Sequence, residues 1–268
     1  MREAEAAVDL ARRAGELILE HAQELGQRSK GRFDLVTNAD LAAEDFLAAE
    51  IGRRFPDHRL LAEESSARKP QALDGPCWVI DPLDGTVNFA GSVPFFSVSL
   101  ALLVDGEPTV GVVYDPLHEE LFSAERGAGA RLNGELLVRA EPPPLVGGSS
   151  GLLAWCARHR PAALEELLED VGKLRIFGSQ ALHLCYAAAG RLAAAVSFEA
   201  CLWDDVAGAL IVREAGLRYT DFEGRKRFPV VAGSQWHLGQ GGRSLAASVD
   251  LHGRLVALFG DPAGRSEG

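Results

Sequence analysis

The hydrophobic positions change their period along the chain, and this change predicts where helices give way to strands. Segments 8–25 and 40–55 repeat apolar side chains at helical spacing, which predicts two amphipathic helices. Segment 78–80 is instead a short apolar run that stops at Asp81 and Pro82. A run of this kind, followed by a proline, predicts a buried strand that ends in a turn.

Three β-rich segments follow, separated by residues that favour turns. The segments are 95–104, 109–114 and 120–124, and the separating pairs are Asp105-Gly106 and Asp115-Pro116. Short connections of this kind join antiparallel neighbours, so the pattern predicts an antiparallel meander.

The second half of the chain alternates between helical and strand patterns after a proline-rich patch at 141–144. Helices are predicted at 161–171, 179–189, 203–215 and 244–259, and strands near Arg175 and at 193–198, 218–221 and 230–232. The proline run predicts a boundary between an N-terminal half, 1–141, and a C-terminal half, 145–268, because prolines continue neither a helix nor a central strand. The alternation predicts an α+β or mixed α/β fold in layers, with both halves in one compact unit.

Composition and charge narrow the classes of protein that the chain can represent. The 268 residues are 47% hydrophobic and 24% charged, and 27 basic against 38 acidic residues give a formal net charge of -11. This composition is typical of a soluble globular protein, and the acidic balance argues against a sequence-independent grip on nucleic acid. A phosphorylated small substrate remains compatible with it, because a bound divalent cation inverts the local charge.

Cysteine spacing and apolar run lengths predict a cytoplasmic protein with no membrane span. The four cysteines lie far apart without a C-x-x-C pair, which indicates reduced thiols rather than a disulfide scaffold or a zinc site. The first residues carry acids where a signal peptide needs bases. The longest apolar stretch, 93–104, is too short to cross a bilayer.

The segment Asp81-Pro82-Leu83-Asp84-Gly85 carries the strongest chemical signal. Its two carboxylates converge on one point if the turn between them is tight, and Pro82 and Gly85 favour such a turn. The carbonyl of Leu83 would then face the same side. Hard oxygen donors in this arrangement suit Mg²⁺. An ordinary aspartate-rich turn after a strand is the competing interpretation.

Further acidic segments each have both a structural and a chemical interpretation. Glu63 follows an apolar run at a strand end, and Asp40 fits a capping box with Thr37. Asp204 and Asp205 open a helix, where they could serve only as a cap or favour its dipole. If these carboxylates gathered at one place they would repel one another unless cations occupied the site, which would give a reason for their proximity.

Together, these segments resemble the inositol monophosphatase family, the lithium-sensitive, metal-dependent phosphatases related to fructose-1,6-bisphosphatase. The resemblance covers nearly the whole chain. The matching motifs are D-x-x-T-x-x-D ending at Asp40, E-E-S at 63–65, W-V-I-D-P-L-D-G-T-x-N at 78–88, G-V-V-Y-D-P at 111–116, A-E-R-G-A-G-A at 124–130, N-G at 133–134, G-S at 178–179, W-D at 203–204 and E-A-G at 214–216.

The resemblance implies a layered αβαβα fold of the inositol monophosphatase/fructose-1,6-bisphosphatase type, commonly dimeric, that hydrolyses phosphate monoesters with two or three Mg²⁺ ions. On the matching positions, Glu63, Asp81 and the carbonyl of Leu83 would hold the first metal. Asp81, Asp84 and Asp204 would hold the second. Glu63 would also belong to the catalytic set.

The resemblance also assigns the groups around the phosphate. The backbone amides of Gly85 and Thr86 would cradle it. Asp40 and the hydroxyl of Thr86 would orient the attacking water and help to deprotonate it, and Gly178 and Ser179 would lie on the substrate side. Metal-assisted hydrolysis of this kind needs no covalent nucleophile.

The sequence departs from the family pattern on the side that recognises the substrate. Ser197 falls where many members carry an acid that binds inositol hydroxyls, and Glu199, two residues further on, could take its place. Asp205 stands where an apolar residue is usual, directly beside Asp204. Ala62 replaces the usual glycine before the metal-binding loop. The metal-binding positions are complete, so the departures concern specificity.

The predicted function is therefore Mg²⁺-dependent hydrolysis of a small phosphate monoester, with inositol-1-phosphate as the default substrate. Fructose-1,6-bisphosphate, histidinol phosphate and phosphorylated nucleotides are alternatives on the same fold. A binding partner of the transcription or ribosome machinery is the alternative of another class, because bacterial relatives can act in this way. We expect a homodimer, with no nucleic acid and no membrane among its partners.

Overall fold

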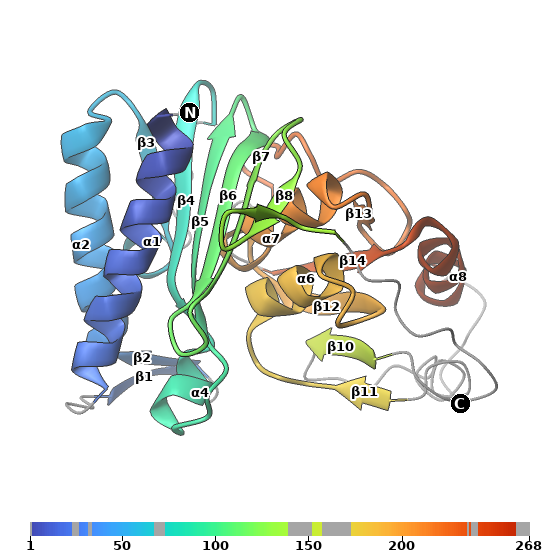
Figure 1. Cartoon of the computed structure of the whole chain (residues 1–268), viewed down its shortest axis with the longest axis horizontal. Helices are drawn as coiled ribbons and strands as arrows, with labels where there is room; N and C mark the ends of the chain where they lie inside the picture. Colours follow the sequence, from blue (N-terminus) through green and yellow to red (C-terminus); the bar gives the residue numbers. More distant parts are fainter. Residues whose placement is uncertain are drawn as a thin grey trace.

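Helices and sheets stack in five layers, in the order α, β, α, β, α (Figure 1). The structure is a computed structural model that describes residues 2–22, 27–31, 34–66, 73–138, 152–156, 173–234, 236 and 241–260. The helical layers are the pair α1 (Arg2–His21) and α2 (Asn38–Arg54), the pair α6 (Gln180–Ala188) and α7 (Leu202–Glu214), and the single helix α8 (Val249–Phe259). A seven-stranded and a five-stranded sheet lie between them. The arrangement confirms the layered fold that the sequence predicts.

The amphipathic pattern of the first segment forms α1, with different ends from those predicted. Leu10, Ala14 and Ile18 are fully buried and share the face that packs on α2 and the first sheet. Glu3 and Glu5 occupy the first turn of α1, where they favour the helix dipole. The helix ends at His21, and residues 23–25 of the predicted helix lie outside the described residues.

A capping box fixes the start of α2, as the sequence predicts. The hydroxyl of Thr37 accepts hydrogen bonds from the amides of Ala39 and Asp40, at 3.2 and 3.5 Å. The carboxylate of Asp40 accepts one in return from the Thr37 amide at 2.8 Å. The three bonds satisfy amides that have no acceptor within the helix.

The seven-stranded sheet confirms the predicted meander. Its strands, in spatial order, are β3 (Arg59–Ala62), β4 (Pro76–Asp84), β5 (Ser97–Val104), β6 (Glu107–Asp115), β7 (Glu120–Glu125), β8 (Ala130–Leu132) and β9 (Glu135–Leu136). Strands β4 to β9 pair antiparallel, whereas β3 runs parallel to β4. Helices cover both faces of this sheet (Figure 1), so its strands are almost continuously buried.

The predicted turn at Asp81 and Pro82 is wrong, because β4 continues through Asp84. The ladder with β5 is regular as far as Asp81 opposite Ser99, then shifts, and resumes with Asp84 opposite Ser97. Proline has no N–H for the ladder, and the Leu83 amide donates to the Asp81 side chain at 2.9 Å instead of to a strand. A bulge within a buried strand therefore brings the two aspartates together.

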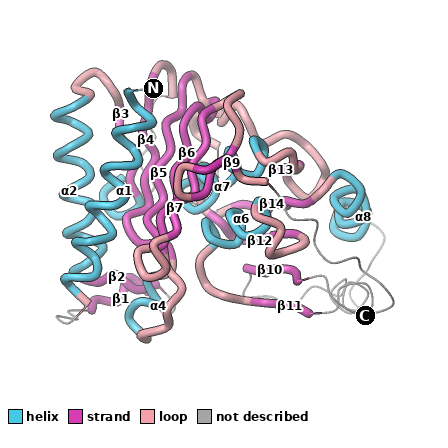
Figure 2. Tube along the Cα trace, viewed as in Figure 1, coloured by secondary structure: helices cyan, strands magenta, loops and turns pink. Residues whose placement is uncertain are grey.

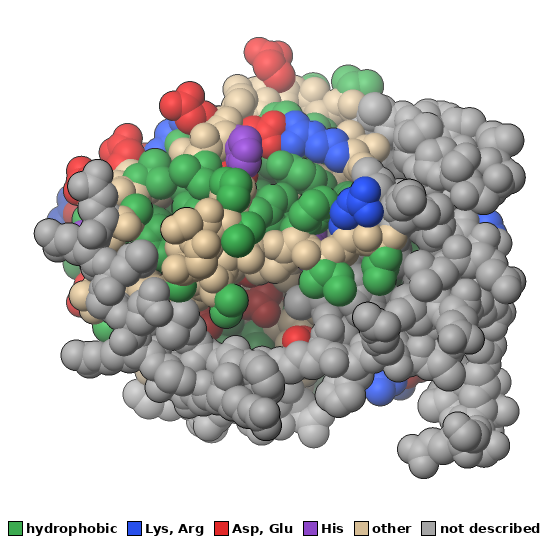
Figure 3. All heavy atoms as spheres, turned by 90° about the horizontal axis from the view of Figure 1, so that it is seen from below, with side chains coloured by type: hydrophobic (Ala, Val, Ile, Leu, Met, Phe, Trp, Pro, Cys, Tyr) green, Lys and Arg blue, Asp and Glu red, His purple; other side chains and the backbone are tan. Residues whose placement is uncertain are grey.

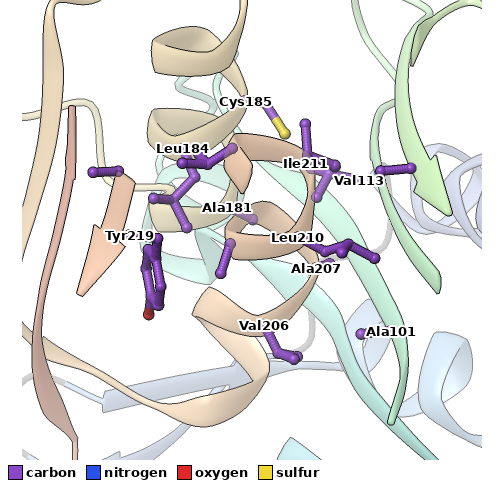
Figure 4. Packing of buried hydrophobic residues seen from close by; sticks show 14 of the residues in the cluster. Ala101, Val113, Ala181, Leu184, Cys185, Val206, Ala207, Leu210, Ile211 and Tyr219 are labelled. Carbon is purple, nitrogen blue, oxygen red and sulfur yellow. The ribbon is translucent and has the colours of Figure 1, made fainter. Parts of the chain in front are cut away.

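The layer of α6 and α7 forms the centre of the core. Figure 4 shows Ala181, Leu184 and Cys185 of α6 against residues of α7, which in turn contact the first sheet. The two helices approach closely at Gly208, where a Cβ atom would lie 2.7 Å from the Cβ of Leu184. A larger residue at position 208 would therefore push α6 away from α7.

The five-stranded sheet contains two departures from the predicted elements. Its order is β11 (Lys173–Arg175), β10 (Leu152–Cys156), β12 (Ala194–Ala200), β14 (Gly242–Ala247) and β13 (Arg218–Thr220) (Figure 2). The helix predicted at 244–259 is wrong at its start, because residues up to Ala247 belong to β14. The strand predicted at 230–232 is also wrong, since that segment is a loop whose Val230 amide donates to the carbonyl of Gly106.

Short elements and undescribed segments complete the chain. The short elements are β1 (Gln27–Gly31), β2 (Asp34–Thr37), α3 (Glu63–Ser66) and α4 (Thr86–Ala90). The proline patch at 141–144 and the helix predicted at 161–171 lie outside the described residues, so the predicted boundary between the two halves stays a prediction. Among the helices that the structure describes, none is long and apolar enough to span a membrane.

Candidate active site

Acidic residues from three parts of the fold meet at the C-terminal end of β4. Asp81 and Asp84 lie on β4 itself, and Glu63 opens α3 directly after β3. Because β3 and β4 are parallel, their carboxyl ends lie at the same edge of the sheet. Asp204 comes from the first turn of α7, which packs on this sheet. The face seen from below shows acidic side chains set deep among hydrophobic ones (Figure 3).

Asp81 lies at the centre of this acidic cluster, which we define as Glu63, Asp81, Asp84 and Asp204. Burial raises the pKa of Asp81 well above its usual range, and the charges of the other three members raise it further. The raised pKa values mean that this cluster retains protons that isolated carboxylates would lose.

Asp84 is held by groups from α6. The hydroxyl of Ser179 donates to Oδ2 of Asp84 at 2.6 Å, and the amide of Ala181 donates to the same oxygen at 2.7 Å. Burial raises the pKa of Asp84 to about 6, although these hydrogen bonds act in the opposite direction. Oδ2 is thus occupied by protein donors, which leaves Oδ1 for a ligand. Ser179 contacts Asp84 and caps α6, and its predicted place on the substrate side stays a prediction.

Asp204 caps α7 and also lies among the other carboxylates of the cluster. Its Oδ2 accepts a hydrogen bond from the Cys201 amide at 2.7 Å, which is the reciprocal half of a helix cap. Burial raises the pKa of Asp204 well above its usual range, and the charges of Asp84 and Glu63 raise it further. A residue that served only as a cap would not have to lie among other carboxylates.

A second group of contacts links the end of β4 to α2. The hydroxyl of Thr86 lies 2.9 Å from Oδ1 of Asp40 and 3.0 Å from the carbonyl of Leu83, so its one proton can go to either acceptor. The other oxygen of Asp40 accepts from both the amide and the hydroxyl of Thr37. Burial raises the pKa of Asp40, while these hydrogen bonds oppose the shift.

Gly85 and Asn88 shape the loop between these two groups. Gly85 has φ = 101°, a left-handed conformation that favours glycine, and a Cβ there would lie 3.1 Å from the carbonyl oxygen of Phe95. The side-chain amide of Asn88 donates to the carbonyls of Phe95 and Phe177, at 2.7 and 2.5 Å. Gly178 packs against that amide, where a Cβ would lie 2.7 Å from Nδ2. Asn88 belongs to the motif at 78–88, but the motif does not predict that its side chain joins the segment at Phe95 to the segment at Phe177.

The donor set of the acidic cluster fits a divalent cation, although it is not arranged as a finished coordination sphere. Among the described residues, no three or more His, Cys, Asp or Glu side chains form a group that could hold a metal ion. Asp81, Asp84 and Asp204 each use one oxygen to accept from a nearby protein donor. Their other oxygens are hard donors in a buried cluster of like charge, which is the chemistry that Mg²⁺ or a similar cation neutralises.

The two candidates for substrate specificity have different surroundings. Ser197 is fully buried in β12, and its hydroxyl accepts from the amides of Glu199 and Ala200 at 3.3 and 2.9 Å. This hydroxyl stabilises a bulge in the strand and faces no solvent. Glu199 is only half-buried, so its carboxylate is the more accessible of the two.

Asp205 forms a buried network that the sequence did not reveal. Its Oδ1 accepts from the side-chain amide of Gln180 at 2.9 Å, and its Oδ2 accepts from the hydroxyl of Tyr219 at 2.7 Å. Gln180 follows Ser179, and Asp205 follows Asp204. The network therefore joins the start of α6 to the start of α7. It lies next to Ser179, which donates to Asp84, and next to Asp204, which belongs to the acidic cluster.

The fold and this cluster agree with the comparisons with known proteins. The model of the inositol monophosphatase family matches residues 2–260, so the chain belongs to this family and is a phosphoric monoester hydrolase. It is 42% identical over 227 residues to the Nus factor SuhB of Pasteurella multocida, which covers 81% of this chain and 84% of that protein. It is 40% identical over 220 residues to inositol monophosphatase 3 of Solanum lycopersicum, with 78% and 82% covered.

A solved structure supports the same assignment. The IMPase of Thermotoga maritima superposes with a TM-score of 0.82 at 29% sequence identity, and the match covers 97% of each chain.

Proposed function

We propose that the chain hydrolyses inositol-1-phosphate to inositol and phosphate, with Mg²⁺ bound in the acidic cluster. The observation that carries the proposal is the set of four carboxylates, buried at Asp81 and Asp84 and partly exposed at Glu63 and Asp204, beside the hydrogen-bonded pair of Thr86 and Asp40. Carboxylates packed this closely repel one another, and bound cations would neutralise that repulsion. The similarity to a protein named inositol monophosphatase 3 supports the choice of substrate.

The proposed ligands come from the residues that the sequence singles out. Glu63, Asp81 and the carbonyl of Leu83 would hold one ion, and Asp84 and Asp204 would share a second with Asp81. When bound, Mg²⁺ supplies charge to polarise the phosphoryl oxygens, acidify a water molecule and neutralise the leaving oxygen.

The protein groups around the phosphate would position the ester and a water molecule. The amides at the start of α4, including those of Gly85 and Thr86, have no acceptor within the helix and would point at phosphate oxygens. The hydroxyl of Thr86 would accept a proton from the attacking water while it donates its own to Asp40. Burial makes Asp40 a stronger base than an exposed aspartate, which suits this role.

The half-buried carboxylate of Glu199 is the proposed contact for hydroxyl groups of the substrate. It lies at the end of β12, two residues before the start of the α7 cap at Cys201. A carboxylate that accepts hydrogen bonds from a diol selects cyclitol or sugar phosphates over simple esters. Fructose-1,6-bisphosphate, histidinol phosphate and nucleotide phosphates therefore remain the competing substrates.

A panel of phosphate esters tests the proposal. Phosphate release would be measured with and without Mg²⁺ on inositol-1-phosphate, fructose-1,6-bisphosphate, histidinol phosphate, adenosine monophosphate and an aryl phosphate. We expect the highest kcat/KM for inositol-1-phosphate and no turnover in excess chelator. A preference of another ester by more than about tenfold, or 1.4 kcal/mol, would replace inositol-1-phosphate as the substrate.

A role with the transcription machinery is the second candidate, and it rests on the 42% identity to a protein named Nus factor SuhB. The two functions can be separated by the variant Asp84→Asn. If the chain binds a transcription elongation complex, this variant should still bind it after losing phosphatase activity. The predicted homodimer belongs to the same proposal, and sedimentation equilibrium of the full chain measures it.

A further inference from the structure

A second cavity lies at the opposite end of α7 from the acidic cluster. Its volume is about 620 Å³, and its walls come from the last turn of α7, from β13, from the loop at 224–229 and from the start of β6. Asp204 and Arg213 stand nine residues apart on α7, which corresponds to about 14 Å at 1.5 Å per residue. The cavity is therefore separate from the site of the proposed hydrolysis.

Positive charge dominates this cavity, although the chain as a whole is acidic. Four cationic side chains line it, namely Arg213, Arg218, Lys226 and Arg227, against the single carboxylate of Glu107. Glu107 lies 3.7 Å from Arg213 and neutralises part of that charge. The cavity lining thus carries an excess of three positive charges in a chain with a net charge of -11, and the buried carboxylate of Asp205 behind it interacts electrostatically with Arg227.

Aromatic rings hold two of these guanidinium groups in place. Arg227 lies over the ring of Trp236 at 3.8 Å, and Arg213 lies over the ring of Phe228 at 5.6 Å. The two rings pack against each other at 5.5 Å. Arginines that are positioned before a ligand arrives lose less conformational entropy when they bind it.

The polar groups of the cavity wall also favour an anion. The last carbonyls of α7 already accept hydrogen bonds from the amides of Ala215, Gly216 and Leu217, so they are not open acceptors. Nε of Arg227 is buried and has no hydrogen-bond partner among the described residues. The groups with remaining hydrogen-bonding capacity are therefore mainly donors on cations.

We propose that this cavity binds a phosphorylated small molecule that carries at least two negative charges. Arginine side chains match the oxygens of a phosphate group with paired hydrogen bonds, and lysine adds a point charge. The volume lies in the range of small-molecule sites, and the concave shape favours a compact ligand over an extended polymer. The proposal does not depend on the phosphatase reaction.

Calorimetric titration of the full chain with inorganic pyrophosphate tests this site. The titration is done in excess chelator, so that no divalent cation is present to bind an anion at the acidic cluster. The double variant Arg218→Ala/Lys226→Ala removes two exposed charges from the cavity. The control Arg53→Ala/Arg126→Ala removes two exposed arginines elsewhere and changes the net charge equally.

We expect the cavity variant to bind pyrophosphate about tenfold more weakly or worse, because each charged hydrogen bond contributes to affinity. The control variant should keep the wild-type affinity, and both should melt like the wild type. Equal weakening in both variants would show a general charge effect and overturn the proposal. Absence of binding to the wild type would also overturn it, as would tight binding of a short RNA, dependent on Arg218 and Lys226, without binding of pyrophosphate.

Discussion

The hydroxyl oxygen of Thr86 lies 2.9 Å from Oδ1 of Asp40, although the two residues are 46 positions apart in the sequence. Thr86 opens the short helix after β4, whereas Asp40 stands in the first turn of α2. The contact joins the segment that would hold the phosphate to a buried carboxylate with a raised pKa. It also distinguishes the catalytic interpretation from helix capping, because the capping bonds of Asp40 use its other oxygen.

Replacing Thr86 should therefore affect rate more than stability. For Thr86→Ala we expect kcat to fall by about 10²- to 10⁴-fold, the usual contribution of a positioned proton-transfer group. Thr86→Ser keeps the hydroxyl and should keep most of the activity. Asp40→Asn should resemble Thr86→Ala in kcat. Steady-state kinetics and thermal melts of the three variants measure both effects.

The capping bond provides a matched control for this pair. Thr37→Ala removes the hydroxyl that caps α2 and should cost about 1 kcal/mol of stability. If Thr86→Ala lowered the melting temperature as much as Thr37→Ala and left kcat unchanged, the pair would be structural and the proposed proton transfer would be wrong.

The pKa of Asp84 gives the metal-free protein a defined dependence on pH. Its folded-state pKa is raised to about 6, so between pH 4 and 6 the unfolded chain loses this proton before the folded chain does. Ionisation of this carboxyl group costs more free energy in the folded protein than in the unfolded chain. The stability of the metal-free protein should therefore fall as pH rises through this window.

The variant Asp84→Asn isolates that contribution. In excess chelator, its melting temperature should fall less than that of the wild type between pH 4 and pH 7, because the residue no longer ionises. Addition of Mg²⁺ at pH 7 should raise the melting temperature of the wild type more than that of the variant. Parallel pH curves for the two proteins would contradict the assignment of the raised pKa to Asp84.

The surroundings of Ser197 lead to a clear expectation about specificity. Ser197→Glu would place a carboxylate in a fully buried strand whose backbone amides already use the serine hydroxyl, so we expect it to destabilise the fold. Glu199→Gln should leave the fold intact and raise KM for inositol-1-phosphate, with little change for an aryl phosphate. Equal KM changes for both esters would exclude Glu199 from substrate recognition.

Substitutions in the network around Asp205 should lower the free energy of unfolding, and the loss should grow with the number of hydrogen bonds removed. Asp205→Val leaves both Gln180 and Tyr219 without a buried acceptor, and we expect a loss of about 1–3 kcal/mol for each unsatisfied group. Tyr219→Phe removes one of the two bonds without leaving a buried donor and should cost less. Urea unfolding of the two single variants and their double variant measures the coupling, and additive losses would contradict a shared network.

Much of the fold followed from the sequence because its elements have strong local patterns. The helix at α2 has both an apolar stripe and a capping box, and the meander has turn residues between its strands. The strand predicted at 230–232 failed because only Val230 packs, as part of a loop against Gly106, while Val231 is exposed. The apolar residue types gave no sign of this difference in burial.

The residues of the candidate site were likewise predicted only in part from local patterns. The motif around Asp81 and Asp84 predicted the central carboxylates, but not that a bulge in a continuing strand would bring them together. The hydrogen bonds of Asn88 and Gln180 link segments that are distant in sequence, so no local pattern indicated them. Contacts of this kind depend on the packing of whole layers.

The proposed hydrolysis requires that the acidic cluster holds the cations. The most direct measurement is phosphate release from inositol-1-phosphate as a function of Mg²⁺ concentration, for the wild type and for Asp204→Asn. We expect saturable activation of the wild type by Mg²⁺. In Asp204→Asn, which should still fold, we expect kcat to fall by several orders of magnitude. Wild-type turnover in excess chelator, or normal turnover of Asp204→Asn at saturating Mg²⁺, would contradict the proposal.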